Sequence, residues 1–274
     1  SSEVFENKST GSAVQMLQGA MPNVNIQVNS GTPGASGTIT VRGIGSVNSS
    51  SPLILIDGTP GELSQVGPGD IESVSVLKDA ASAAIYGSRA AFGVILVTTK
   101  NAAKGRSKVS YNNYFSFSTP TVSTDFVWQG YDHAYIFDTS YFGQKGVMGA
   151  ATGLTSADYE QLLLRRNDYV EDPSRPWVVE DEDGKYHYWG NFDWWKYLYK
   201  TWTPSQSHSI SVSGGTDKVT YYVSGNYYTK DGFMRNADEK YRQFSLNAKI
   251  NARVYKWLKI SNNTYFYDSE HAFP

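Results

Sequence analysis

The sequence predicts a small α/β domain followed by a series of long antiparallel β-strands. Aromatic residues mark the division, because only three of the 20 Tyr, 12 Phe and 7 Trp residues lie in residues 1–105. The first part reads as strand, helix, turn and strand, whereas the later chain repeatedly alternates apolar and polar residues with the period of a β-strand. We therefore place a boundary in the polar, basic linker 101–107, which gives domains over residues 1–105 and 106–274.

The elements of the first domain are predicted by composition and spacing. Alternating Val and Ser residues over 73–76 are typical of a half-buried strand. Residues 78–86 are rich in Ala, with Asp79 near the start and Gly87 just past the end, which predicts a short helix. Residues 94–99 (VILVTT) are apolar on both faces and predict a second strand that is buried.

The second domain shows about five segments of strict alternation, each long enough to cross a bilayer as a tilted strand. The expected strands cover residues 107–118, 207–213, 218–229, 241–251 and 257–267. Their connections alternate between long and short, with a very long segment at 119–204, a tight turn at 214–217, a medium loop at 230–240 and a short turn at 253–256.

Two architectures are compatible with this alternation. Alternation alone favours a soluble β-sandwich, in which one face of each strand packs in the core and the other meets water. Aromatic residues near the strand ends, together with the alternation of short turns and long loops, are instead typical of outer-membrane β-barrels.

Composition limits the chemistry. The chain has no Cys, so it holds neither a disulfide nor a thiolate metal site. The net charge of −2 gives no reason to expect a nucleic-acid partner, and the mean hydropathy of −0.42 without a long apolar run predicts no transmembrane helix. The four His residues lack metal-binding spacing, and GxSxG and P-loop motifs are missing, so we expect no catalytic residue, metal or cofactor. The sequence does not exclude a pair of catalytic carboxylates, but no motif points to one.

The long segment 119–204 is too long for a bare loop and is expected to carry its own structure. We predict a helix over 156–169 (SADYEQLLLRRNDY) that begins at Thr155 or Ser156, with Ser156 as its N-cap. Residues 177–189 (WVVEDEDGKYHYW) predict a hairpin that turns at Asp183-Gly184. The acidic residues before that turn lack the spacing of a calcium-binding loop and predict a solvated turn.

Tryptophan and tyrosine crowd the end of this segment. Packing and interfacial anchoring are one explanation of this density. A surface on which sugar rings stack is the other, because aromatic rings offer an apolar face beside polar tips. The candidate substrate or lid contacts are Trp177, Trp189, Trp194 and Trp195.

Three blocks in order carry a resemblance to a known family. They are VRGIGS at 41–46, PLILIDGTP at 52–60 and DIESVSVLKDAASAAIYGSRAAFGVILVTTK at 70–100. This series resembles the plug domain of SusC-like (SusC/RagA-type) TonB-dependent transporters, the outer-membrane importers of Bacteroidetes-type bacteria. The similarity covers residues 13–104, and the later chain is similar to the start of the same family's barrel. It implies a transmembrane barrel of about 22 antiparallel strands with an α/β plug in its lumen.

The resemblance also implies roles for residues. Charges of the plug are expected to meet carboxylates on the inner barrel wall, and the candidate plug–barrel contacts are Arg42, Asp57, Asp79 and Arg89. Surface positions for the arginines, and a plain turn at Asp57-Gly58, are the alternatives. One face of each strand is expected to meet lipid, which gives the lipid-facing candidates Val109, Phe115, Ile210, Val223 and Leu246.

The implied function is TonB-dependent import of oligosaccharides across the cell outer membrane without covalent chemistry. A SusD-like surface lipoprotein would form a lid over the barrel, segment 119–204 would be extracellular, and TonB, energised by ExbB and ExbD, would pull on the plug. The remainder of the barrel, and a dimer of the two-protein complex, are further expected partners. We expect no signal peptide, TonB box or N-terminal extension domain within this sequence. The alternatives are import of peptides, a soluble surface glycan-binding module or hydrolase, and a signalling receptor.

Overall fold

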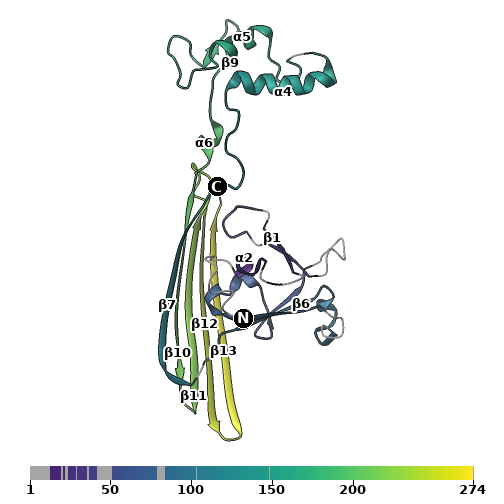
Figure 1. The fold of residues 1–274 in the computed structure, drawn as a ribbon. Coiled ribbons are helices and arrows are strands. Elements are labelled where there is room, and N and C mark those ends of the chain that lie inside the picture. Colours follow the sequence, from purple (N-terminus) through teal and green to yellow (C-terminus); the bar gives the residue numbers. More distant parts are fainter. Residues whose placement is uncertain are drawn as a thin grey trace. The chain divides into compact units, whose positions relative to one another are not determined.

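The computed structural model (Figure 1) describes residues 13–19, 21, 24–28, 30–35, 37–41, 51–78, 84–102, 104–147 and 149–273. Residues 13–102, as far as they are described, are termed the N-terminal domain. Its helix and strands are α2 (Ala13–Leu17), β1 (Asn25–Gln27), β2 (Thr38–Thr40), β3 (Leu53–Ile56), β4 (Thr59–Pro60), β5 (Ile71–Leu77) and β6 (Val94–Thr99). Three 3₁₀ segments accompany them, η1 (Leu63–Gln65), η2 (Pro68–Asp70) and η3 (Ala84–Ala90).

Strand β6 lies inside a four-stranded sheet of order β4-β3-β6-β5. It pairs in parallel with β3 and antiparallel with β5, and Val94, Ile95 and Val97 are fully buried. The prediction of a buried strand over 94–99 is therefore confirmed. The predicted turn at Asp57-Gly58 is also confirmed, since both residues have positive φ (49° and 86°) and join β3 to β4 as a two-residue hairpin loop.

The predicted helix over 78–86 falls largely on residues 79–83, which lie outside the described residues. The following segment η3 consists of two short helices that meet at a kink at Gly87 and continue to Ala90. Gly87 has non-helical angles, φ 68° and ψ −155°, so the helical geometry before it ends there as expected. Glycine adopts this conformation without the steric cost that a side chain would bring.

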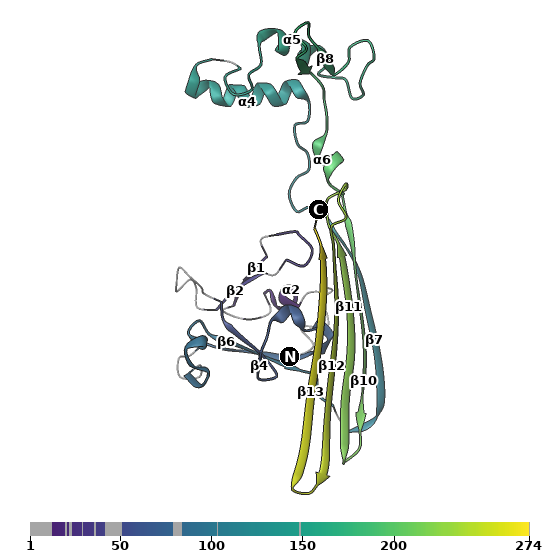
Figure 2. The ribbon, with the colours of Figure 1, turned by 180° about the vertical axis from the view of Figure 1, so that it is seen from behind.

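The second part of the chain forms one antiparallel sheet, termed the five-stranded sheet (Figures 1 and 2). Its strands are β7 (Gly105–Ser118), β10 (Thr203–Gly215), β11 (Val219–Asp231), β12 (Lys240–Tyr255) and β13 (Leu258–Ala272), in the order β13-β12-β11-β10-β7. All five predicted strands are confirmed, and most are longer than predicted. The connection between β12 and β13 contains only two residues, as the short predicted turn requires.

The two faces of the five-stranded sheet differ in composition. The face termed the outer face carries exposed apolar side chains, among them Val109, Phe115, Ile210 and Val223, with Leu246 half-buried on the same face. The opposite, inner face is polar and is buried against the N-terminal domain. No second sheet covers the outer face within the described residues, so the β-sandwich alternative is wrong.

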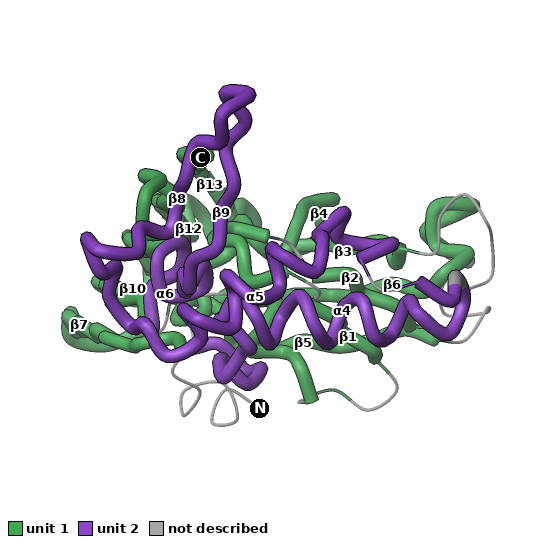
Figure 3. The backbone as a smooth tube through the Cα atoms, turned by 90° about the horizontal axis from the view of Figure 1, so that it is seen from above, with its two compact units in different colours: residues 1–119, 202–274 green, residues 120–201 purple. Residues whose placement is uncertain are grey.

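The chain divides into two compact units, residues 1–119 with 202–274 and residues 120–201 (Figure 3). The second unit contains α4 (Gly130–Lys145), α5 (Ser156–Leu164), β8 (Val178–Glu180), β9 (Tyr186–Tyr188) and α6 (Trp194–Leu198). Strands β8 and β9 form the predicted hairpin, with Gly184 at φ 76° in its turn. Among the described residues, no helix has the length and apolar character needed to cross a membrane.

Helix α5 begins at Ser156, one of the two predicted starts, but its N-cap and its end differ from the prediction. Thr155, not Ser156, is the N-cap, because its hydroxyl accepts the backbone amide of Asp158 and its own amide donates to the Asp158 carboxylate (2.8 Å). The helix ends at Leu164 rather than at residue 169, and Arg165 is its C-cap.

Candidate functional site: polar contacts between the N-terminal domain and the sheet

The N-terminal domain contacts the five-stranded sheet mainly through hydrogen bonds. The buried inner-face side chains that lie beneath it belong to β11 and β12 and are almost all polar. They include Tyr222, Ser224, Asn226, Ser245, Asn247 and Lys249. Alternation in these strands therefore separates an exposed apolar face from a buried polar one, the reverse of a soluble protein.

Asp70 forms the most deeply buried contact. It ends η2, immediately before β5, and is only 1% exposed. Its carboxyl oxygens accept a hydrogen bond from the Tyr222 hydroxyl (2.9 Å) and from the Asn226 side-chain amide (2.7 Å). The backbone approaches closely here, since a Cβ at Gly67 would lie 2.4 Å from the Asn226 amide. Glycine at this position therefore allows η2 to reach the sheet.

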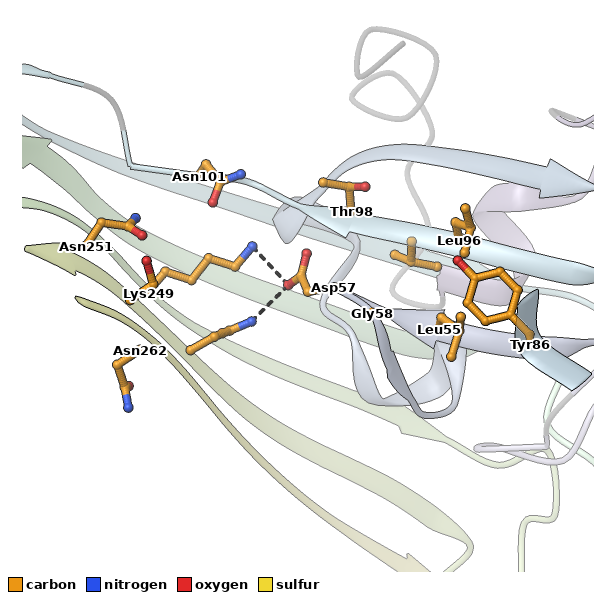
Figure 4. Close-up of a pocket in the computed structure, with 13 residues that line it drawn as sticks. Leu55, Asp57, Gly58, Tyr86, Leu96, Thr98, Asn101, Lys249, Asn251 and Asn262 are labelled. Carbon is orange, nitrogen blue, oxygen red and sulfur yellow. Dashed lines mark hydrogen bonds and ion pairs between the residues drawn. The ribbon is translucent and has the colours of Figure 1, made fainter. Parts of the chain in front are cut away.

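Asp57 forms a second contact with β12 and β13 (Figure 4), in which Thr99 of β6 also takes part. The Asp57 carboxylate accepts hydrogen bonds from the Thr99 amide (2.9 Å) and hydroxyl (2.7 Å). The same carboxylate lies 2.9 Å from the Lys249 ammonium and accepts the Asn263 amide (3.1 Å). The Lys249 ammonium also donates to the Thr99 carbonyl (3.0 Å), so Lys249 contacts both residues.

The Asp57–Lys249 pair is largely removed from water, with side chains that are 16% and 7% exposed. Burial by itself would raise the pKa of the Asp57 carboxyl. The hydrogen bonds from Thr99 and the neighbouring Lys249 ammonium outweigh burial and lower that pKa below its ordinary value. The carboxylate therefore stays ionised at neutral pH and balances the charge of the lysine.

A pocket of about 460 Å³ adjoins this contact (Figure 4). One end is polar and contains Asp57, Lys249 and Asn262, whereas Leu55 and Tyr86 line the other end. Neither end contains a group of three His, Asp or Glu residues that could hold a metal, and none occurs elsewhere in the described part of the chain. The arrangement is suited to holding two parts of a protein together.

The four predicted contact residues have different fates. Asp57 contacts the sheet, and its charged partner is a lysine. Arg89 is exposed on η3 and forms no ion pair with the sheet within the described residues. Arg42 and Asp79 lie outside the described residues. Sequence reasoning did not identify Asp70 or Lys249, because their partners are about 150 positions away in the chain.

The second unit contains a separate pocket of about 400 Å³ with aromatic walls. Trp194 and Trp195 line it, whereas Trp177 and Trp189 do not. The Trp189 indole donates to the Asp158 carboxylate (2.9 Å), and its ring lies beneath the Arg165 guanidinium.

Asp158 links α5 to the β8–β9 hairpin of this unit. Burial alone would raise the pKa of its carboxyl. Hydrogen bonds from Thr155, Trp189 and His187 instead lower the pKa to about 2. Trp189 therefore has a structural role inside the unit.

Comparison with known proteins agrees with this architecture. Residues 1–94 match the family described as TonB-dependent Receptor Plug Domain. The chain is 30% identical to TonB-dependent receptor SusC of Bacteroides thetaiotaomicron over a 277-residue alignment, which covers 96% of this chain and 23% of that protein. It is 32% identical to TonB-dependent receptor P3 of Formosa agariphila over 258 residues, or 93% of this chain and 21% of that protein. The chain thus spans about a fifth of the length of these curated relatives.

Solved structures give the same result. The RagAB peptide importer in the open-open state matches 100% of this chain and 30% of its own, with a TM-score of 0.73 and 26% identity. The siderophore receptor PirA from Pseudomonas aeruginosa shares the fold, with a TM-score of 0.53 at 18% identity over 98% of this chain and 34% of its own.

A plug domain docked on the polar face of adjoining barrel strands defines a TonB-dependent receptor. Within that class, the chain belongs to the SusC-like receptors. The resemblance inferred from the three sequence blocks is therefore confirmed, and the N-terminal domain is referred to below as the plug domain.

Proposed function

We propose that the protein imports oligosaccharides across the outer membrane as a TonB-dependent, SusC-like transporter. The observation that carries this proposal is the polar contact between the plug domain and the inner face of the sheet. Hydrogen bonds of this kind contribute only about 0.5–1.5 kcal/mol each, because water replaces them when they break. A plug that closes a pore and yet moves under force needs contacts of this kind.

The outer face supports a position in the bilayer. From Val219 to Tyr227 the outward side chains of β11 span about 26 Å at ~3.3 Å per residue. At a strand tilt of about 40° this length rises roughly 20 Å through the bilayer, which is most of the roughly 25 Å apolar band of outer-membrane barrels. We infer that Val109, Phe115, Ile210, Val223 and Leu246 face lipid. The edges of β7 and β13 would then pair with further strands of a barrel of about 22, since open edges are not tolerated in lipid.

The transport cycle that fits this architecture uses two partners. A SusD-like lipoprotein would cover the outer mouth and trap substrate beside the extracellular unit 120–201. TonB, energised by ExbB and ExbD, would then displace the plug domain by pulling from the periplasmic side. No covalent step is required.

Import of peptides is the second candidate function. The similarity to the RagAB peptide importer over the whole chain favours it. The two cargo classes can be separated by uptake assays on the full-length receptor, produced with its lipoprotein in a Bacteroidetes host that lacks both. Fluorescent oligosaccharides and peptides of similar mass would be supplied in parallel.

We expect oligosaccharide uptake that stops when TonB is deleted or when a protonophore is added. Uptake of peptides alone would assign the second function instead. Oligosaccharide uptake that persists without TonB would contradict the proposed mechanism. The parent strain without the receptor is the control for adsorption to the cell surface.

A further inference from the structure

The aromatic pocket of the 120–201 unit has the properties of a ligand site. Its volume of about 400 Å³ is within the usual range for small-molecule sites. It lies between the segment that precedes α4 and the segment around α6. The rings that matter here are Phe126, Trp128, Tyr188, Phe192, Trp194 and Trp195.

Hydrogen bonds of Asn191 hold together the segments that line the pocket. Asn191, 3% exposed, lies between the lining residues Gly190 and Phe192 in sequence. Its side chain accepts the Gly130 amide (2.8 Å) and donates to the carbonyls of Arg165 (2.6 Å) and Asp168 (3.1 Å). A Cβ at Gly130 would lie 2.4 Å from the Gly190 carbonyl oxygen, so the lack of a side chain at Gly130 allows the segments to touch. These contacts hold the pocket in shape without a ligand.

The walls are fixed by ring–ring packing. Trp195 packs between Phe126 and Tyr199, with ring centroids 5.0 and 4.5 Å away. The ring of Trp194 lies 4.6 Å from that of Phe192 in an edge-to-face arrangement, yet Trp194 is 60% exposed. A fixed indole with most of its surface in solvent offers a flat platform at little entropic cost.

Charge restricts the class of ligand. The pocket lining contains one carboxylate, Asp193, and no Lys or Arg. Asp193 caps α6 by accepting the Lys196 amide (2.9 Å), and its second oxygen lies 3.1 Å from the Lys196 ammonium. The Asp193 carboxylate repels an anionic ligand. It attracts a cationic ligand only weakly, because the Lys196 ammonium already neutralises its charge. A neutral ligand with hydroxyl groups fits best.

We propose that this pocket binds one or two rings of a neutral oligosaccharide, with Trp194 as the stacking platform and Asp193 as a hydroxyl acceptor. The inference rests on the proposed function for the choice of glycans, and it adds a binding site within the loop unit itself. Such a site would hold glycan independently of the plug domain.

Calorimetric titration of the full-length receptor, purified in detergent, with maltohexaose, cellohexaose and mannohexaose tests the proposal. We expect at least one to bind, Trp194→Ala to weaken that binding at least about 10-fold, and Trp194→Phe to recover part of it, because stacking needs a ring. Trp257→Ala is the matched control, since Trp257 is 79% exposed outside the pocket. Near-UV circular dichroism checks that the Trp194 variants are folded.

Binding that Trp194→Ala leaves unchanged, or no binding of any hexasaccharide, would overturn the proposal. So would displacement of the sugar by choline or by the peptide Gly-Trp-Gly, which would assign the pocket to cations or to aromatic side chains. Failure of the pocket is distinguishable from failure of the import function. If glycan uptake by cells persists while the chain binds no sugar at Trp194, only the pocket proposal fails. If the pocket binds sugar and cells take up none, only the import proposal fails.

Discussion

Replacing Asp57 with Asn removes the negative charge that faces the buried Lys249 ammonium. Asp57 has a φ of 49°, and Asn tolerates this left-handed region as well as Asp does. The amide oxygen of Asn can still accept the hydrogen bond from the Thr99 backbone. Its NH₂ group then replaces the oxygen that accepts from the Thr99 hydroxyl and the Asn263 amide, so the substitution removes the charge together with these acceptor contacts.

The expected magnitude follows from burial. Removing one partner of a buried ion pair costs about 3–5 kcal/mol, because the other charge is left without compensation. We take the lower end, about 3 kcal/mol, since Asp57 retains 16% exposure and Lys249 keeps the Thr99 carbonyl as an acceptor. This free energy corresponds to a roughly 100-fold increase in the fraction of molecules with the plug domain displaced.

Thiol labelling measures that fraction, because the chain contains no cysteine. A single Ser224→Cys reporter would lie on the inner face, where Ser224 is buried beneath the plug domain. We expect Asp57→Asn to speed its labelling about 100-fold, and the added change Lys249→Met to reverse much of that effect by removing the orphaned charge.

Asp217→Asn is the matched control, because the Lys104–Asp217 pair is exposed and contributes about 0–1 kcal/mol. Labelling of the Asp57→Asn protein at the rate of this control would refute the reasoning. The pKa of Asp57 is lowered by folding, so the charge contact is present above the unfolded pKa. In the protein with Asp57 intact, the fraction of displaced plug domain should therefore increase as the pH falls through the folded pKa, once each labelling rate is divided by the thiolate fraction at that pH.

Two further predictions concern other parts of the chain. Asp158→Asn should destabilise the 120–201 unit by about 2 kcal/mol, since hydrogen bonds to a charged group are worth about 1.5–3 kcal/mol and those from Thr155 and Trp189 are weakened. Because folding lowers the Asp158 pKa to about 2, this stabilisation should be complete above about pH 4 and should disappear as the pH falls towards 2. A fluorescence titration with acid would detect this loss. An identical acid transition in the Asp158→Asn variant would contradict the assignment. On the outer face, Ile210→Lys should cost about 2–4 kcal/mol in urea-unfolding experiments in liposomes, and Phe117→Lys, at the strand end, only about 0–1. Equal costs at both positions would argue against a lipid-facing outer surface.

The strands were predictable because their two faces meet different surroundings. Over residues 219–227, Val219, Val223 and Tyr227 are exposed, whereas Tyr222, Ser224 and Asn226 are buried. The sequence shows this period of two without any knowledge of the fold. Alternation cannot tell which face is buried, and for that reason the sequence alone left a β-sandwich open. The family resemblance of residues 41–100 resolved this choice correctly.

Helix α4 was not predicted, and the reason lies in its residues. Apolar and aromatic side chains occur on several sides of the helix, and Tyr135, Ile136 and Phe137 are consecutive and all exposed. A helix without an apolar stripe of period 3.6 gives no amphipathic signal.

The contacts of the plug domain were predictable only in part. Asp57 stands in a turn motif and was identified. Asp70 follows Pro-Gly in what looks like an ordinary turn, and its partners Tyr222 and Asn226 are 152 and 156 positions later. Pairing over such distances leaves no local spacing, so it becomes visible only after folding.

The polar character of the inner face has a consequence for movement under load. The apolar core of the plug domain, built around Met16, Leu63 and Ile95, lies apart from the hydrogen-bonded surface that meets the sheet. A pulling force would therefore separate the plug domain from the sheet first, because water can replace each hydrogen bond that breaks there. Opening the core would instead expose apolar surface to water, and no new interaction would compensate for this cost. A plug domain that leaves the sheet while its hydrophobic core stays folded can bind the sheet again without refolding. Repeated transport cycles need such reversibility.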